Sequence, residues 1–143
     1  MDWSWTLWYR VGGDDARAAA ARLATTDLKP EEFDELTREF AAGRILWEQL
    51  RESLPARTRA IVAIELDHLG DRIRGEAAQM RTAAIVELNT DQPIATIARD
   101  LGLTRQAASR SANAGSPLRG HMTTARLARA QHDDDDTLRE ATT

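Results

Sequence analysis

The sequence predicts a mainly α fold that carries one short β-strand at its N-terminus. Apolar residues recur every three or four positions through most of residues 30–88, which is the period of amphipathic helices. A nearly strict alternation of apolar and polar residues, the period of a strand, is found in residues 2–11. Prolines and capping residues near position 55 and at positions 89–93 separate the helical segments.

The composition of the chain indicates its general class. Its 143 residues suit one domain, or one small domain with an appendage, and its net charge is -4. No apolar run approaches the ~20 residues of a membrane-spanning helix, and the N-terminus lacks the basic start and apolar core of a secretory signal. The absence of cysteine excludes disulfides and thiolate metal sites. These observations predict a cytoplasmic protein.

Residues 2–11 place their large apolar side chains on one face of a strand that ends at two glycines. These side chains include Trp3, Trp5, Leu7 and Tyr9. A single strand is not stable alone, so two interpretations remain open. The strand pairs with the same strand of a second subunit, which makes these four residues dimerisation candidates, or the aromatic residues pack as an arm on the helical core.

Three helices are expected after the strand. An alanine-rich helix covers residues 14–25, and a second helix, opened by Pro30 and two glutamates, covers residues 30–53. A third, longer helix begins near Pro55 and ends near Leu88.

The third helix carries an apolar stripe from Val62 to Leu88. The stripe crosses residues 59–66 without a change of phase, which favours a helix there over the strand that this run could also form. The stripe is interpreted either as a dimer interface or as a face buried against the preceding helix, or as a mixture of both. Its dimerisation candidates are Leu66, Leu69 and Ile73.

Residues 94–101 and 104–113 are expected to form two short helices on either side of Gly102. Glycine allows the positive φ of a tight turn. Ala98 and Ala108 are small enough to let the two helices cross closely. The pattern predicts a helix-turn-helix, in which two helices meet at a steep angle.

The outer face of the second short helix is polar and free of carboxylates. Arginine pairs with guanine, glutamine and asparagine pair with adenine, and hydroxyls bond bases or phosphates, so this face fits the major groove of DNA. The predicted contacts on this helix are Thr104, Arg105, Gln106, Ser109, Arg110 and Asn113. Thr96, Arg99 and Arg119 are predicted to add flanking DNA contacts.

The stretch LGLTRQAA at residues 101–108 resembles bacterial helix-turn-helix regulators whose recognition helix begins L-G-(V/L)-(T/S)-R-Q-A-A. The resemblance covers about residues 85–114, and Ala98 stands where the motif has an alanine. Ala108 departs from the β-branched residue often found there, and Ser111 is polar where an apolar residue is common. The resemblance implies a tri-helical DNA-binding domain in a cytoplasmic, nucleoid-associated and usually dimeric protein that regulates transcription.

These predictions divide the chain into three parts. Residues 1–56 form a region for dimerisation or partner binding, and residues 57–114 form the long helix with the DNA-binding domain. Residues 115–143 form a flexible tail that is first basic and then acidic. The basic residues of the tail either extend the phosphate contacts or are only solvated, and the acidic run at residues 133–136 either folds back on them or keeps the tail soluble.

The predicted function is sequence-specific binding of double-stranded DNA by a homodimeric transcriptional repressor. A two-fold dimer would place two recognition helices about one DNA turn, ~34 Å, apart. Two alternatives remain open: a protein-interaction module such as an antitoxin or accessory factor, and a DNA binder that maintains a plasmid or chromosome. No enzymatic activity, cofactor or metal ion is predicted, because the three histidines are scattered and the chain has neither a nucleophile elbow nor a phosphate-binding glycine loop.

Overall fold

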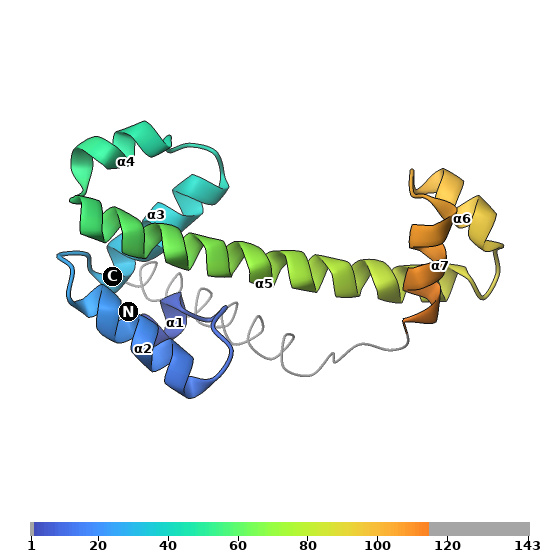
Figure 1. The fold of residues 1–143 in the computed structure, drawn as a ribbon, viewed down its shortest axis with the longest axis horizontal. Helices are drawn as coiled ribbons and strands as arrows, with labels where there is room; N and C mark the ends of the chain where they lie inside the picture. The colour runs from blue at the N-terminus through green and yellow to red at the C-terminus, as the bar shows by residue number, and fades with distance from the viewer. Residues whose placement is uncertain (1, 115–143) are drawn as a thin grey trace, which may run out of the picture. The chain divides into compact units, whose positions relative to one another are not determined.

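The computed structural model describes residues 2–114, and this part of the chain consists of helices joined by turns (Figure 1). Seven α-helices and no strand occur within the described range, which confirms the predicted mainly α fold. The predictions for the tail, among them Arg119 as a DNA contact and the acidic run at residues 133–136, lie outside the described residues.

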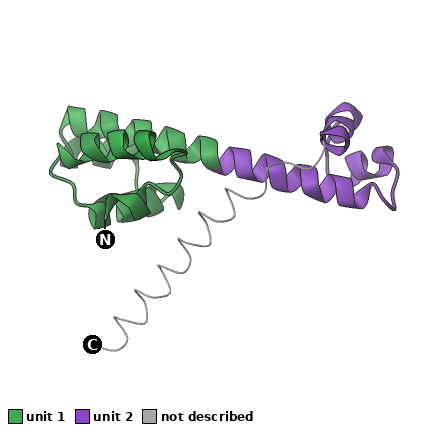
Figure 2. Ribbon diagram, turned by 90° about the horizontal axis from the view of Figure 1, so that it is seen from below, with its two compact units in different colours: residues 1–72, 125–143 green, residues 73–124 purple. Residues whose placement is uncertain are grey.

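The chain divides into two compact units, and the division falls inside one helix, α5 (Ala56–Leu88) (Figure 2). Among the described residues, unit 1 comprises residues 2–72 and unit 2 comprises residues 73–114. The predicted boundary between residues 56 and 57 therefore lies earlier than the observed division. The reason is that the first turns of α5 belong to the core of unit 1, where Val62 is fully buried.

Unit 1 contains four helices besides the start of α5. They are α1 (Trp3–Thr6), α2 (Gly13–Ala24), α3 (Pro30–Ala41) and α4 (Trp47–Ser53). The alanine-rich helix predicted over residues 14–25 is confirmed by α2. The core of the unit is apolar and includes Leu7, Leu23, Phe33 and Val62, each at most 2% exposed.

The β-strand predicted over residues 2–11 is wrong, because this segment starts with α1 and continues as a turn. The Asp2 side chain accepts a hydrogen bond from the backbone of the first turn and so caps α1. The Leu7 N–H donates to the Trp3 carbonyl oxygen at 3.0 Å, and the Arg10 N–H donates to the Leu7 carbonyl oxygen at 2.9 Å. A strand without a neighbour would leave such groups unpaired.

The N-terminal segment instead packs as an arm on the helical core, in agreement with the alternative interpretation of its aromatic residues. The Trp3 ring lies against Phe33 with the ring centroids 5.8 Å apart. Leu7 and Tyr9 are 2% and 4% exposed. Both residues are therefore buried within their own chain, and the dimer role predicted for them does not fit this placement.

The single helix predicted over residues 30–53 is interrupted between α3 and α4. Gly43 has a φ of 70° in this turn, a conformation that favours glycine. The Arg44 N–H donates to the Glu39 carbonyl oxygen at 2.9 Å. The Arg44 guanidinium also pairs with the Glu39 carboxylate at 2.6 Å, which lowers the pKa of Glu39. Apolar residues keep a helical spacing across the turn, so the sequence pattern did not reveal the break.

A buried ion pair connects the N-terminal segment to α5. Glu65 is fully buried, and its carboxylate accepts hydrogen bonds from Arg10 at 2.6 Å and 3.0 Å. The Tyr9 hydroxyl donates to the same carboxylate at 3.1 Å. Arg10 also pairs with Asp15 of α2 at 2.9 Å. The paired and hydrogen-bonded arrangement offsets the cost of burying the Glu65 charge.

Tyr9 is the sole tyrosine of the chain, and burial, reinforced by the Glu65 carboxylate, raises its pKa. The folded pKa lies above the unfolded value of about 10. The resulting stability is complete below pH of about 10 and is lost as pH rises through the folded pKa.

We therefore expect tyrosinate absorbance to appear only together with the loss of native tryptophan fluorescence in an alkaline titration. The Tyr9→Phe variant should lose less stability at high pH, and tyrosinate in the native protein near pH 10 would contradict the expectation.

Unit 2 contains the second part of α5 and two short helices. These are α6 (Ile94–Asp100) and α7 (Arg105–Asn113). They confirm the two short helices predicted on either side of Gly102. The long helix is confirmed by α5, which includes the run at residues 59–66 that could also have formed a strand.

Candidate nucleic-acid interface

A tight turn joins α6 to α7. Gly102 has a φ of 66°, which residues with a Cβ rarely adopt. The Leu103 N–H donates to the Ala98 carbonyl oxygen at 2.8 Å. Thr104 then caps α7, since its side chain accepts a hydrogen bond from the Ala107 N–H at 3.1 Å. The direction change between the helices is thus built from interactions within a few residues.

Small and aliphatic side chains fill the inner side of this helix pair. Ala98 of α6 is 4% exposed and Ala108 of α7 is fully buried, as expected for two helices that cross closely. Ile97 of α6 and Ile85 of α5 are also buried. With the inner side of α7 occupied by packing, the polar residues of this helix lie on its outer side.

The outer side of α7 forms a shallow hollow that is open to solvent, here called the recognition face. It is lined by Arg105, Gln106, Ser109, Arg110, Asn113 and Ala114. Ser109 is half-buried and the others are exposed. The structure therefore brings together every predicted DNA contact of this helix except Thr104, which is exposed but serves as the cap.

The recognition face carries positive charge without a nearby carboxylate of its own. Arg105 and Arg110 project from α7, and residues 101–114 contain no acidic residue. Backbone amides at the start of a helix add to a positive potential. The surface can therefore accept an anionic ligand and offers neutral donors and acceptors beside the arginines.

The predicted flanking contacts are not part of this hollow. Thr96 is half-buried on α6, and Arg99 is exposed at its end, where its Nε atom lies 3.6 Å from an Asp100 carboxylate oxygen. Neither residue is among those that line the recognition face. Arg119 lies outside the described residues.

The sequence pattern does not single out two polar residues of α5 that lie beside α7. Arg81 and Thr82 line a groove together with residues of α7, including Arg110. Their spacing on the long helix resembles that of any solvated polar face. Only the packing of α7 beside α5 gives them a shared surface with residues of α7.

The predicted dimerisation residues are placed in two different surroundings. Trp3, Leu66 and Leu69 pack against the core of unit 1, and Trp5 is half-buried. Ile73, in contrast, is 44% exposed on α5. The stripe of α5 is thus buried at its start, and an exposed stretch begins at Ile73.

Within residues 2–114, no helix has both the length and the apolar character needed to cross a membrane. The same range contains no group of three acidic or histidine side chains arranged to hold a metal ion. Comparisons with models of protein families, with curated proteins and with solved structures find no match to this chain.

Proposed function

We propose that this protein binds double-stranded DNA sequence-specifically, with α6 and α7 acting as a helix-turn-helix. The observation that carries the proposal is the recognition face, where arginine, glutamine, asparagine and serine side chains share one exposed side of α7. A helix fits the major groove, which is about 12 Å wide. The buried Ala98 of α6 and the buried Ala108 of α7 support the placement of α7 as the second helix of such a motif.

Each part of the recognition face has a matching chemical partner on DNA. Arg105 lies in the first turn of α7, the part of a recognition helix that typically approaches base edges. Its guanidinium suits the O6 and N7 acceptors of guanine, and the Gln106 and Asn113 amides suit adenine. Ser109 suits a base or a phosphate. The absence of acids from residues 101–114 avoids repulsion from the phosphate backbone.

The selection of bound sequences from random duplexes tests this proposal directly. The full chain is incubated with the pool at several stated salt concentrations, because phosphate contacts make affinity salt-dependent. We expect enrichment of one motif, arranged as an inverted repeat if two copies bind. A pool that stays random at low salt, with no measurable retention of duplex DNA, would refute the function.

We also propose that two copies associate and that the dimer represses transcription by occupying an operator. Support comes from the exposed stretch of the α5 stripe in unit 2. Ile73 and Met80 are 44% and 71% exposed, and Ala77 and Ala84 are exposed between and beyond them. These residues share one face of the helix. In an antiparallel pair, Ile73 can face Ala84 of a second copy and Met80 can face Ala77, so that each large side chain meets a small one.

The Met80→Glu variant is expected to weaken this association by about ten-fold or more. Burying an unpaired charge costs more than 1.4 kcal/mol, the free energy that corresponds to a factor of ten. Sedimentation velocity over a range of protein concentrations measures the change. Val86→Glu is a matched control, because Val86 is 40% exposed on the same helix and lies off the stripe. Equal dissociation constants for Met80→Glu and the unmodified chain would rule out this face.

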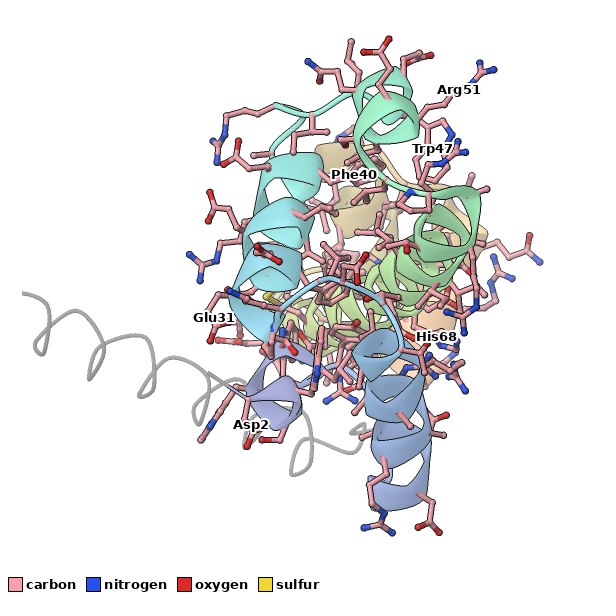
Figure 3. The ribbon with its side chains drawn as sticks, turned by 90° about the vertical axis from the view of Figure 1, so that its left-hand side faces the viewer. Asp2, Glu31, Phe40, Trp47, Arg51 and His68 are labelled. Carbon is pink, nitrogen blue, oxygen red and sulfur yellow. The ribbon has the colours of Figure 1, made fainter. Side chains whose placement is uncertain are left out.

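A second candidate function, a protein-interaction module, is favoured by one feature of unit 1. Phe40, Leu46 and Trp47 are large apolar residues near the turn between α3 and α4, and they are 37%, 62% and 41% exposed. Phe40 and Trp47 are labelled in Figure 3. Exposed apolar clusters often mark protein contacts. A stoichiometric protein partner recovered at native levels and lost in Trp47→Ser, together with no DNA motif, would favour this function. Binding sites clustered away from promoters would instead favour plasmid or chromosome maintenance.

A further inference from the structure

A groove in unit 2 lies beside the recognition face and is partly separate from it. It is lined by Arg81 and Thr82 of α5, by Leu103 of the turn, and by Ala107, Arg110 and Ser111 of α7. Arg110 lines both the groove and the recognition face, and Arg105 lines the recognition face only. The two arginines of α7 therefore lie in different surroundings.

The groove combines two kinds of surface. Arg81 and Arg110 are exposed and supply two guanidinium groups, and Thr82 and Ser111 supply hydroxyls. Leu103 and Ala107 are half-buried and supply apolar surface. None of the described residues that line the groove is acidic. The lining thus offers charge and hydrogen-bond donors for an anion, together with apolar surface for a neighbouring group.

We propose that this groove binds one phosphodiester of the DNA backbone together with its deoxyribose, a proposal that rests on the function proposed above. Guanidinium groups bind phosphate oxygens with two parallel hydrogen bonds. A deoxyribose presents carbon-bound surface next to the phosphate, which suits Leu103 and Ala107. A free phosphate ion would use only the charged part of this lining.

The proposal divides the work between the two arginines of α7. Arg105, in the first turn of α7, contacts base edges. Arg110, together with Arg81 of α5, contacts the phosphate backbone of the DNA. Backbone contacts fix the register of a protein on the duplex and carry little sequence information. α5 therefore takes part in DNA binding and fixes the depth at which α7 enters the major groove of the DNA.

The salt dependence of DNA binding by Arg81→Ala tests this assignment. Each phosphate contact contributes about 0.9 to the slope of log affinity against log salt. We expect the slope to become shallower, with its magnitude smaller by about 0.9. This change corresponds to a roughly eight-fold loss of affinity at 0.1 M salt when the affinities at 1 M agree. The loss should be the same on the selected duplex and on unrelated duplexes. Arg81→Lys should retain the slope, and Arg110→Ala combined with Arg81→Ala should lose less than the product of the single losses.

Arg51→Ala is the matched control, since Arg51 is an exposed arginine on α4 in unit 1 and its loss removes the same charge (Figure 3). Circular dichroism checks that each variant is folded. An unchanged slope in Arg81→Ala, a loss equal to that of Arg51→Ala, or a loss confined to one base sequence would overturn the inference while the proposed function stands. Failure of the unmodified chain to bind any duplex would instead overturn the proposed function itself.

Discussion

The Glu65→Ala variant is expected to lower the free energy of unfolding by about 3–5 kcal/mol. The replacement leaves the Arg10 guanidinium, whose side chain is 4% exposed, without its main carboxylate partner. It also removes the acceptor of the Tyr9 hydroxyl. Arg10 keeps only its pair with the exposed Asp15, and the loss of its buried partner accounts for most of the effect, since breaking one side of a buried pair costs more than the pair contributes.

Urea denaturation followed by tryptophan fluorescence measures this effect in the relevant unit. All four tryptophans of the chain, at positions 3, 5, 8 and 47, belong to unit 1. Asp15→Ala is the matched control, because Asp15 is the second partner of Arg10 but its side chain is 50% exposed. We expect a loss of only about 0–1 kcal/mol for this variant. If Glu65→Ala also loses no more than that, the buried pair does not anchor the N-terminal segment.

The Arg105→Ala variant is expected to weaken binding to the selected duplex by about 1–3 kcal/mol and to relax the choice of one base pair. Arg105 is exposed in the first turn of α7 and contributes to the recognition face but not to the neighbouring groove. The measurement is a series of affinities for duplexes that differ at single base pairs, at one stated salt concentration.

Arg51→Ala serves again as the charge-matched control for this series. It should leave the base preferences unchanged. An equal loss on every sequence would indicate that Arg105 contacts a phosphate. An unchanged affinity would contradict the proposed placement of α7 in the major groove.

The helix pair of unit 2 could be predicted because its structure depends on nearby residues. Gly102 supplies the positive φ of the turn, and Thr104 caps the next helix through a bond to Ala107. The polar face of α7 follows from the helical period once those ends are known. The same holds for α5, whose apolar stripe runs without a change of phase.

The N-terminal segment could not be predicted in this way. Alternating residues indicate a strand only when a neighbouring strand exists to pair with it. Long-range contacts hold this segment: Trp3 packs on Phe33, and Glu65 lies 56 residues from Tyr9 and 55 from Arg10 along the chain. The groove beside α7 also depends on contacts between residues that are distant in the sequence, because Arg81 lines it only where α5 packs beside α7. Long-range contacts of this kind leave no periodic signal in the sequence.

The aliphatic packing of unit 2 has a consequence for the proposed DNA binding. Its buried residues include Ile85, Ile97 and Ala108, and residues 73–143 contain no phenylalanine, tyrosine or tryptophan. Proteins that hold single strands stack the unpaired bases on aromatic rings. Without such rings, the DNA binding proposed for the recognition face would have to read bases by their edges while they stay paired. We therefore expect the protein to lose its sequence preference on a melted or single-stranded version of the selected site.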